Sequence, residues 1–187
     1  MHPLVLITPC SRPQNLEKVK SSIRFEHIRF WIIVYDGSKV EPWTVPNFHH
    51  DQILEMIHTS EGAWGNPQRN FALQYLSQTD YEGLVGFLDD DNTIIPPFWA
   101  ILEKAQMGKV NAFDRILRGW RQVTLPIAGF CDTATVLVDF SLKGADVWRL
   151  FENNADGMYI ENIVKQTPGC WNHIPEIGAV YNSLRRD

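Results

Sequence analysis

The amino-acid sequence predicts a single α/β domain in which helices flank a mainly parallel central sheet. Apolar, β-branched runs alternate with helical patterns along the first half of the chain, which is the order of βαβ units. The runs are continuous rather than alternating, as in strands that are buried on both faces. The 187 residues, 44% hydrophobic and 21% charged, suffice for a sizeable core, so we expect residues 1–187 to form one domain.

The first predicted helix lies between two predicted strands. Residues 4–8, LVLIT, and residues 30–36, FWIIVYD, are short apolar runs that suit buried parallel strands. Residues 11–23 show apolar side chains on one helical face, and Ser11 with Gln14 matches a capping box. These three elements form the first βαβ unit.

Two more strands and two more helices are predicted between residues 52 and 108. Residues 52–59 and 83–88 are the expected third and fourth strands. Asn66 suits the cap of a helix over residues 67–76. Residues 96–108 show a helical pattern with an early proline and a glycine at its end.

The second half of the chain is less regular. Residues 133–140, TATVLVDF, predict a strand, and residues 157–166, GMYIENIVKQ, predict a helix. Signals between Lys109 and Pro126 are mixed and give no assignment.

Four polar clusters follow predicted strands or begin predicted helices. They are residues 8–13 (TPCSRP), Asp36, residues 65–70 (GNPQRN) and residues 89–91 (DDD). Ligands of open α/β sheets bind beyond the carboxyl ends of the strands. We therefore expect these clusters to converge on one edge of the sheet and to form the binding site.

Three consecutive acids, Asp89, Asp90 and Asp91, need a positive partner. A hard divalent cation is one, because Mg²⁺ and Mn²⁺ prefer oxygen ligands and often bind through one or two carboxylates and substrate phosphates. The alternative is a solvated acidic turn, since aspartate is a common turn residue. Their position directly after the apolar run VGFL favours the metal site.

Several blocks of the sequence resemble one family. FLDDDNT looks like the DxD element of nucleotide-sugar glycosyltransferases with the GT-A fold. The blocks ITPCSRP, WIIVYDG, NPQRNFAL and GFLDDDNT follow the order and spacing seen in the inverting β-1,3-glucuronyltransferases. Later in the chain, PIAGFCDTA resembles the acceptor-side strand of that family, and ADGMYIENIV resembles its segment with the catalytic base.

The resemblance implies a donor site for a nucleotide diphosphate sugar, with UDP favoured, in residues 1–95. Asp91 would bind Mn²⁺ or Mg²⁺, Asp89 would orient its neighbours, and Trp64 or Trp171 would close over the donor. Pro9, Cys10 and Asp36 would border the uracil, and Arg12 lies in the first loop of the donor site. Arg69 would reach the nucleotide or the donor sugar, Asp90 the ribose hydroxyls or the sugar, and His173 the diphosphate or the metal.

Inverting sugar transfer needs a general base that removes a proton from the acceptor hydroxyl. The resemblance implies Asp156 for this role, with Glu161 in reserve, in an acceptor-side half of residues 96–187. The sequence departs from the family here, because Asp156 stands where the family has glutamate. The chain is also short for the family and lacks the membrane anchor of its Golgi members.

Two other functions remain open. A sugar-phosphate nucleotidyltransferase uses a similar fold and metal, but its first loop is usually rich in glycine, and TPCSRPQN contains none. A binding module for nucleotide sugars or glycans that has lost turnover is the second. Release of free UDP from the donor, with and without candidate acceptors, would separate the binding module from an enzyme.

The composition of the chain disfavours several classes of binding partner. A net charge of −5 disfavours general binding to nucleic acid or anionic membranes. The longest apolar stretches fall short of the roughly 20 residues that span a bilayer. Three widely spaced cysteines show no metal-binding spacing and suit a reducing compartment. We expect a carbohydrate acceptor, a bacterial or viral-host cytoplasm rather than the Golgi, and an oligomeric state that the sequence leaves open.

Overall fold

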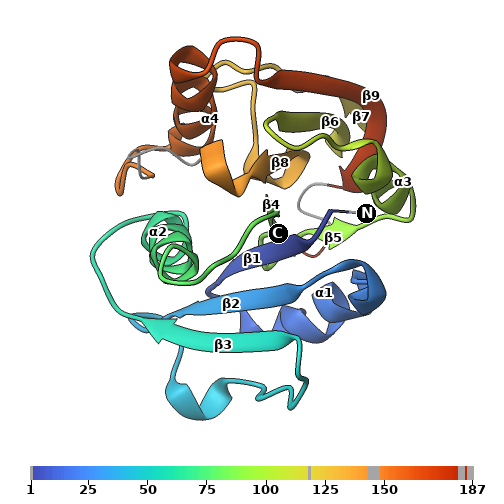
Figure 1. Cartoon of the computed structure of the whole chain (residues 1–187). Coiled ribbons are helices and arrows are strands. Elements are labelled where there is room, and N and C mark those ends of the chain that lie inside the picture. The colour runs from blue at the N-terminus through green and yellow to red at the C-terminus, as the bar shows by residue number, and fades with distance from the viewer. Residues whose placement is uncertain (1, 118, 143–147, 181–183, 185–187) are drawn as a thin grey trace.

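The computed structural model describes residues 2–117, 119–142, 148–180 and 184. These residues form one sheet with helices on both faces (Figure 1). Its strands are β1 (Leu4–Cys10), β2 (Phe30–Asp36), β3 (Ile53–His58), β4 (Leu84–Phe87), β5 (Thr93–Ile94), β6 (Val110–Leu117), β7 (Trp120–Gln122), β8 (Val136–Asp139) and β9 (Trp171–Val180). The α-helices are α1 (Leu16–Ser22), α2 (Asn66–Leu76), α3 (Pro97–Lys104) and α4 (Ala155–Gln166).

The first half of the sheet is parallel. Its strand order is β3-β2-β1-β4, and the order continues through β8-β6-β9-β5, with β7 paired to β6. Pairing of β1 with β2 and β4, and of β2 with β3, is parallel throughout. All four predicted strands of this half are present: β1, β2 and β4 are buried along nearly their whole length, whereas β3 is the edge strand and is only partly buried.

Alternate residues of the central strands pack into two separate cores. Leu4 and Leu6 of β1 share one core with Leu16 and Val19 of α1, and α3 packs there too. Val5 of β1 belongs to the other core, which contains apolar residues of α2 and α4. The sheet is therefore covered on both faces, which leaves its strand ends as the place for a binding site.

The second half of the sheet is mixed. Strand β8 runs antiparallel to both β4 and β6, whereas β6 and β9 are parallel with a bulge near Asp114. The predicted strand over residues 133–140 is shorter than expected, because a 3₁₀ helix, η4 (Thr133–Thr135), precedes β8. Strands β6 and β7 occupy the region that had no assignment, and β9 was not predicted.

Two predicted helix caps are wrong. Helix α1 begins at Leu16 after the 3₁₀ helix η1 (Pro13–Asn15), and Ser11 donates instead to the distant carboxylate of Asp90. Asn66 is the first residue of α2 rather than its cap, and its side-chain amide donates to the carbonyl of Arg149 at 3.0 Å. In both places a tertiary partner competes successfully with the local capping bond.

No helix in the described part of the chain is long and apolar enough to cross a bilayer.

Candidate functional site

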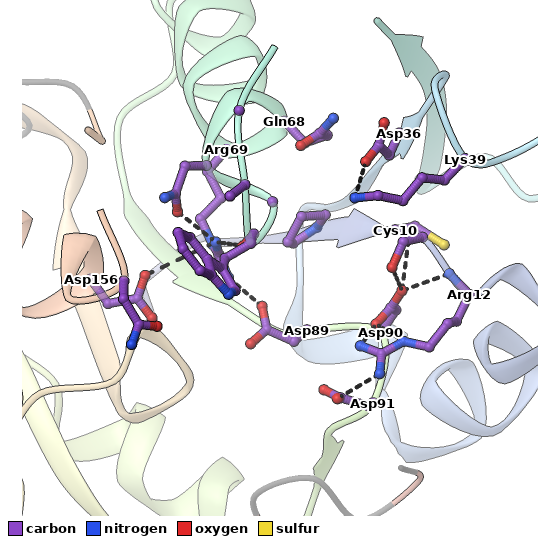
Figure 2. A pocket seen from close by; sticks show the side chains of 18 of the residues that line it. Cys10, Arg12, Asp36, Lys39, Gln68, Arg69, Asp89, Asp90, Asp91 and Asp156 are labelled. Carbon is purple, nitrogen blue, oxygen red and sulfur yellow. Dashed lines mark hydrogen bonds and ion pairs between the residues drawn. The ribbon is translucent and has the colours of Figure 1, made fainter. Parts of the chain in front are cut away.

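A cavity of about 560 Å³ lies beyond the carboxyl ends of β1, β2 and β4. Figure 2 shows it as an elongated site, with Asp36 and Lys39 toward one end and Asp156 toward the other. The structure brings most of the sequence-predicted residues to this cavity: Pro9, Cys10, Arg12, Asp36, Arg69, Asp89, Asp90, Asp91 and Asp156. Its volume lies within the usual range for small-molecule sites, about 300–1,000 Å³.

Asp90 ties the loop after β1 to the loop after β4. Its Oδ2 accepts from the backbone N–H groups of Ser11 at 2.7 Å and Arg12 at 2.8 Å. Its Oδ1 accepts from Nε of Arg12 at 2.9 Å and from Nη2 of the same residue. Asp90 is only 2% exposed. With both oxygens occupied in this way, its carboxylate holds the loops in place.

Arg12 also pairs with Asp91. Its Nη1 lies 2.9 Å from Oδ2 of Asp91, so one guanidinium bridges two neighbouring carboxylates. Arg12 is therefore one positive partner of the acidic run. Its side chain is about one-third exposed, whereas those of Asp90 and Asp91 are buried.

Arg69 organises the centre of the cavity from the first turns of α2. Its Nη1 donates to the carbonyl of Trp64 at 2.7 Å and to Oδ1 of Asn66 at 3.2 Å. Its Nη2 donates to Asp89, and its Nη1 lies 4.0 Å from Asp156. The side chain is buried, yet its Nε has no hydrogen-bond partner. A buried guanidinium of this kind fixes the positions of the groups that it bonds, which here belong to the wall of the cavity.

Asp89 and Asp132 share a region that is crowded with negative charge. Burial is the main cause that raises the pKa of Asp89 to about 7; Arg69 opposes it, while Asp132, Asp156 and Asp91 add to it. Burial and then the neighbouring Asp156 likewise raise the pKa of Asp132, although Arg115 pairs with its carboxylate. The environment therefore disfavours full ionisation of these acids.

Asp156 is held in a defined orientation in the first turn of α4. Its Oδ1 accepts from the indole N–H of Trp148 at 3.1 Å, and its Oδ2 accepts from the hydroxyl of Thr133 at 3.2 Å. Gly157 follows it. A Cβ at Gly157 would approach the Cα of Ala128 to 2.7 Å, so the start of the helix packs closely against the loop that contains Ala128. A carboxylate fixed in this way can act on a substrate without first being reoriented.

Asp36 forms local contacts at the other end of the cavity. Its Oδ1 accepts from the backbone N–H and the hydroxyl of Ser38, and its Oδ2 lies 2.7 Å from Nζ of Lys39. Burial raises its pKa, but the bonds from Lys39 and Ser38 outweigh burial and hold that pKa below its ordinary value. Asp36 is thus an ionised acceptor beside a largely exposed lysine.

The environment of Cys10 disfavours the thiolate form of its side chain. Burial and then the nearby Asp90 carboxylate raise the pKa of Cys10 far above its ordinary value. The thiolate is the reactive form of cysteine, so a nucleophilic role of Cys10 is disfavoured.

The cavity has a large excess of negative charge. The described residues that line it include three basic side chains and six carboxylates, which leaves a formal charge of −3 when all are ionised. The basic residues are Arg12, Lys39 and Arg69; the acids are Asp36, Asp89, Asp90, Asp91, Glu152 and Asp156. This charge disfavours a phosphate group that binds without an added cation or protons.

The donor set fits a hard divalent cation that shares its coordination with a ligand. Among the described residues, no group of three or more His, Cys, Asp and Glu could hold a metal by itself. Mg²⁺ and Mn²⁺ nevertheless often bind through one or two carboxylates and substrate phosphates. Asp91, beside the cavity and within the charge excess, suits that mode, provided that Nη1 of Arg12 is exchanged for the ion.

Three sequence-predicted residues do not line the cavity. Glu161 accepts from the backbone N–H of Ala128 and pairs with Lys165 on the outer part of α4. His173 lies in β9, where its Nε2 is 2.8 Å from Oδ1 of the buried Asp114. Trp171 lies in the same strand and packs against the core that contains α2 and α4.

Several residues of the site were missed in the sequence. Thr133 and Trp148 orient Asp156, and Lys39 and Glu152 line the cavity. Thr133 belongs to the block PIAGFCDTA, whose resemblance to an acceptor-side strand could have identified it as a residue of the site. The other three stand in stretches with no motif, and only the fold brings them to the cavity.

Comparison with known proteins supports the fold. No family model and no curated protein matches the sequence. Among solved structures, the chain is similar to TarS of S. aureus residues 1–349 in complex with UDP-GlcNAc, with a TM-score of 0.69 and 12% identity over 100% of this chain and 59% of that one. A longer TarS structure gives a TM-score of 0.67 and 13% identity over 95% of this chain and 36% of that one.

A third similar structure is 4-diphosphocytidyl-2C-methyl-D-erythritol synthase, with a TM-score of 0.60 and 11% identity over 100% of this chain and 94% of that one. At such low identities the similarity establishes the fold alone. The predicted GT-A-like α/β fold is confirmed. The chain spans less than two thirds of the length of the TarS structures, and none of these three is a β-1,3-glucuronyltransferase.

The contacts of Asp90 predict a large effect on stability. Asp90→Ala would leave the backbone N–H groups of Ser11 and Arg12 without their acceptor and would remove one of two carboxylates from the guanidinium. Loss of a partner from a buried charged pair costs about 3–5 kcal/mol. Because Arg12 is partly exposed, we expect the free energy of unfolding to fall by about 3 kcal/mol, measured by chemical denaturation.

The matched control is Asp80→Ala, in the exposed turn before β4. Its effect should stay within about 0.5 kcal/mol. Equal losses of stability in the two variants would contradict the role of Asp90.

Proposed function

We propose that the chain transfers a sugar from a nucleotide diphosphate donor, with UDP favoured, to a hydroxyl group of a carbohydrate acceptor. The observation that carries the proposal is the layout of the cavity: an acidic run lies at its centre, and a separately held carboxylate, Asp156, lies at one end (Figure 2). The resemblance to the β-1,3-glucuronyltransferases makes inversion the expected outcome and a hexosyl or glucuronyl group the expected cargo.

The donor would lie along residues 1–95. Pro9, Cys10 and Asp36, beyond the ends of β1 and β2, would border the base, where an ionised carboxylate matches an N–H donor. Arg69, whose side chain lines the cavity, would donate to the sugar or the diphosphate. The likeness in fold to TarS, which has been solved with UDP-GlcNAc and with UDP, supports a nucleotide sugar in this place.

The proposal includes a divalent cation, Mn²⁺ or Mg²⁺, held by Asp91 together with the diphosphate. Such an ion supplies charge neutralisation for the leaving nucleotide. The charge of the cavity supports this part of the proposal. Two like unit charges about 4 Å apart repel each other by about 4 kcal/mol at an effective dielectric constant of about 20. With a formal excess of three negative charges in the lining, repulsion of a diphosphate would outweigh its hydrogen bonds.

Asp156 would act as the general base. It would take the proton of the acceptor hydroxyl while the oxygen forms a bond to the anomeric carbon and the bond from that carbon to the diphosphate breaks, which inverts the configuration. Trp148 and Thr133 would keep the carboxylate aimed at the acceptor. Arg69, bonded to Asp89 and near Asp156, would fix the spacing between the donor and the base.

A nucleotidyltransferase is the second candidate, because the chain matches nearly the full length of the synthase. The loop after β1 argues against it. That loop has no glycine, and its one basic residue, Arg12, is bonded to Asp90 and Asp91 rather than available for a triphosphate.

Nucleotide-sugar binding is the first test. We expect UDP-sugars with Mn²⁺ to raise the melting temperature, because a ligand of the native state stabilises it by mass action. Asp91→Ala should abolish this shift while the protein without ligand stays folded. A larger shift with CTP and a sugar phosphate would favour the nucleotidyltransferase. Binding without release of UDP in the presence of glycan acceptors would favour the non-catalytic module.

The second test concerns the base. Asp156→Asn keeps the size of the side chain but is a far weaker base, so turnover should fall about 10²- to 10⁴-fold with little change in donor affinity. Glu161→Gln is the matched control on the same helix, and it should retain turnover because Glu161 does not line the cavity. Full activity of Asp156→Asn would contradict the assignment, and a retained anomeric configuration in the product, determined by NMR, would contradict inversion.

A further inference from the structure

One wall of the cavity, at the Asp156 end, is a segment joined to the start of α2. The backbone of Trp148 forms two hydrogen bonds with the side-chain amide of Asn70, at 2.8 and 2.9 Å. The carbonyl of Leu150 accepts from the backbone N–H of Ala63 at 2.8 Å. Together with the bond from Asn66 to Arg149, these contacts hold residues 148–150 beside the loop before α2. Glu152 and Asn153, which follow, line the cavity.

The loop before α2 presents an exposed tryptophan to the same part of the cavity. Trp64 lines it and is 58% exposed. Its backbone has a φ of 53°, which is uncommon for a bulky residue. The carbonyl bond from Arg69 holds this conformation, and Gly65 behind it has no room for a side chain, because a Cβ would approach that of Pro9 to 2.5 Å. An exposed aromatic ring on a strained, fixed backbone indicates a contact surface.

The charges of this end select the ligand. Asp156 and Glu152 bring two carboxylates to it, and Asp89 lies next to it at the centre of the cavity. The basic residue beside them, Arg69, is already bonded to Asp89. An anionic group would meet uncompensated charge. An uncharged sugar suits the site better, because its hydroxyls can donate to carboxylates and its apolar ring face can stack on an indole.

We propose that Trp64, Glu152 and Asn153 form the acceptor subsite and that its ligand is an uncharged sugar ring. This inference rests on the proposed function, and it adds the class of acceptor and the surface that binds it. The ring of the acceptor lies on the indole of Trp64, which places one of its hydroxyls within reach of Asp156.

The test uses protein saturated with UDP and Mn²⁺. Binding of four neutral disaccharides (cellobiose, lactose, maltose and chitobiose) is compared with that of cellobiouronic acid and lactose 3′-phosphate by saturation-transfer NMR and calorimetry. We expect at least one neutral disaccharide to bind and the two charged ones not to bind. Trp64→Ala should weaken the neutral ligand about tenfold or more, and Trp64→Phe should weaken it less.

The matched control is Trp43→Ala, because Trp43 is 80% exposed and does not line the cavity. It should leave the affinity for both disaccharide and UDP unchanged. The subsite is contradicted if no neutral disaccharide binds, if the charged ones bind more tightly, or if Trp64→Ala weakens UDP-sugar and not the disaccharide, since Trp64 would then cover the donor. Failure of the proposed function itself is seen separately, as absence of UDP-sugar binding by the unmodified protein.

Discussion

The excess of carboxylates over basic side chains in the cavity is the constraint on which the rest of the site depends. Arg12 bridges Asp90 and Asp91, and Arg69 joins Asp89 to the neighbourhood of Asp156. These two guanidinium groups allow the loops to approach one another without prohibitive repulsion. They do not cancel the charge, because six acids face three bases along the lining. This excess is the observation on which the proposed cation and the proposed phosphate-bearing ligand rest.

The fold explains why this charge can be tolerated. Two apolar cores on opposite faces of the sheet include α1 and α3 on one side and α2 and α4 on the other. Most of the stability therefore arises away from the cavity, and the strand ends can hold costly groups. Three such residues line the cavity. Arg69 is buried with an Nε that has no hydrogen-bond partner, Asp89 has a raised pKa, and Trp64 has a left-handed backbone conformation.

How much could be predicted from the sequence depends on how local each signal is. The strands near residues 4–8 and 30–36 were predicted because a continuous apolar run describes its own environment. The acids after β4 were identified as part of a site because the edge of a parallel sheet gathers such residues. Both signals are short-range patterns, and the folded structure agrees with them.

Long-range partners could not be predicted. Ser11 and Asp90 are 79 positions apart, and the bond between them replaced a capping box that was locally plausible. Thr133 of η4 donates to Asp156 in the first turn of α4, 23 positions along the chain. Strand β9 carries polar residues whose partners, such as Asp114 for His173, lie on a neighbouring strand. In each instance the contact joins two segments, and the local sequence of neither segment indicates the other as its partner.

The central claim is that the cavity admits a diphosphate only when a cation accompanies it, and calorimetry of uridine and UDP tests it most directly. Uridine has no phosphate, so its affinity should be the same in EDTA and in Mn²⁺. UDP should bind at least about tenfold more tightly in Mn²⁺ than in EDTA, a difference of about 1.4 kcal/mol or more. Equal affinity of UDP under the two conditions would contradict the account.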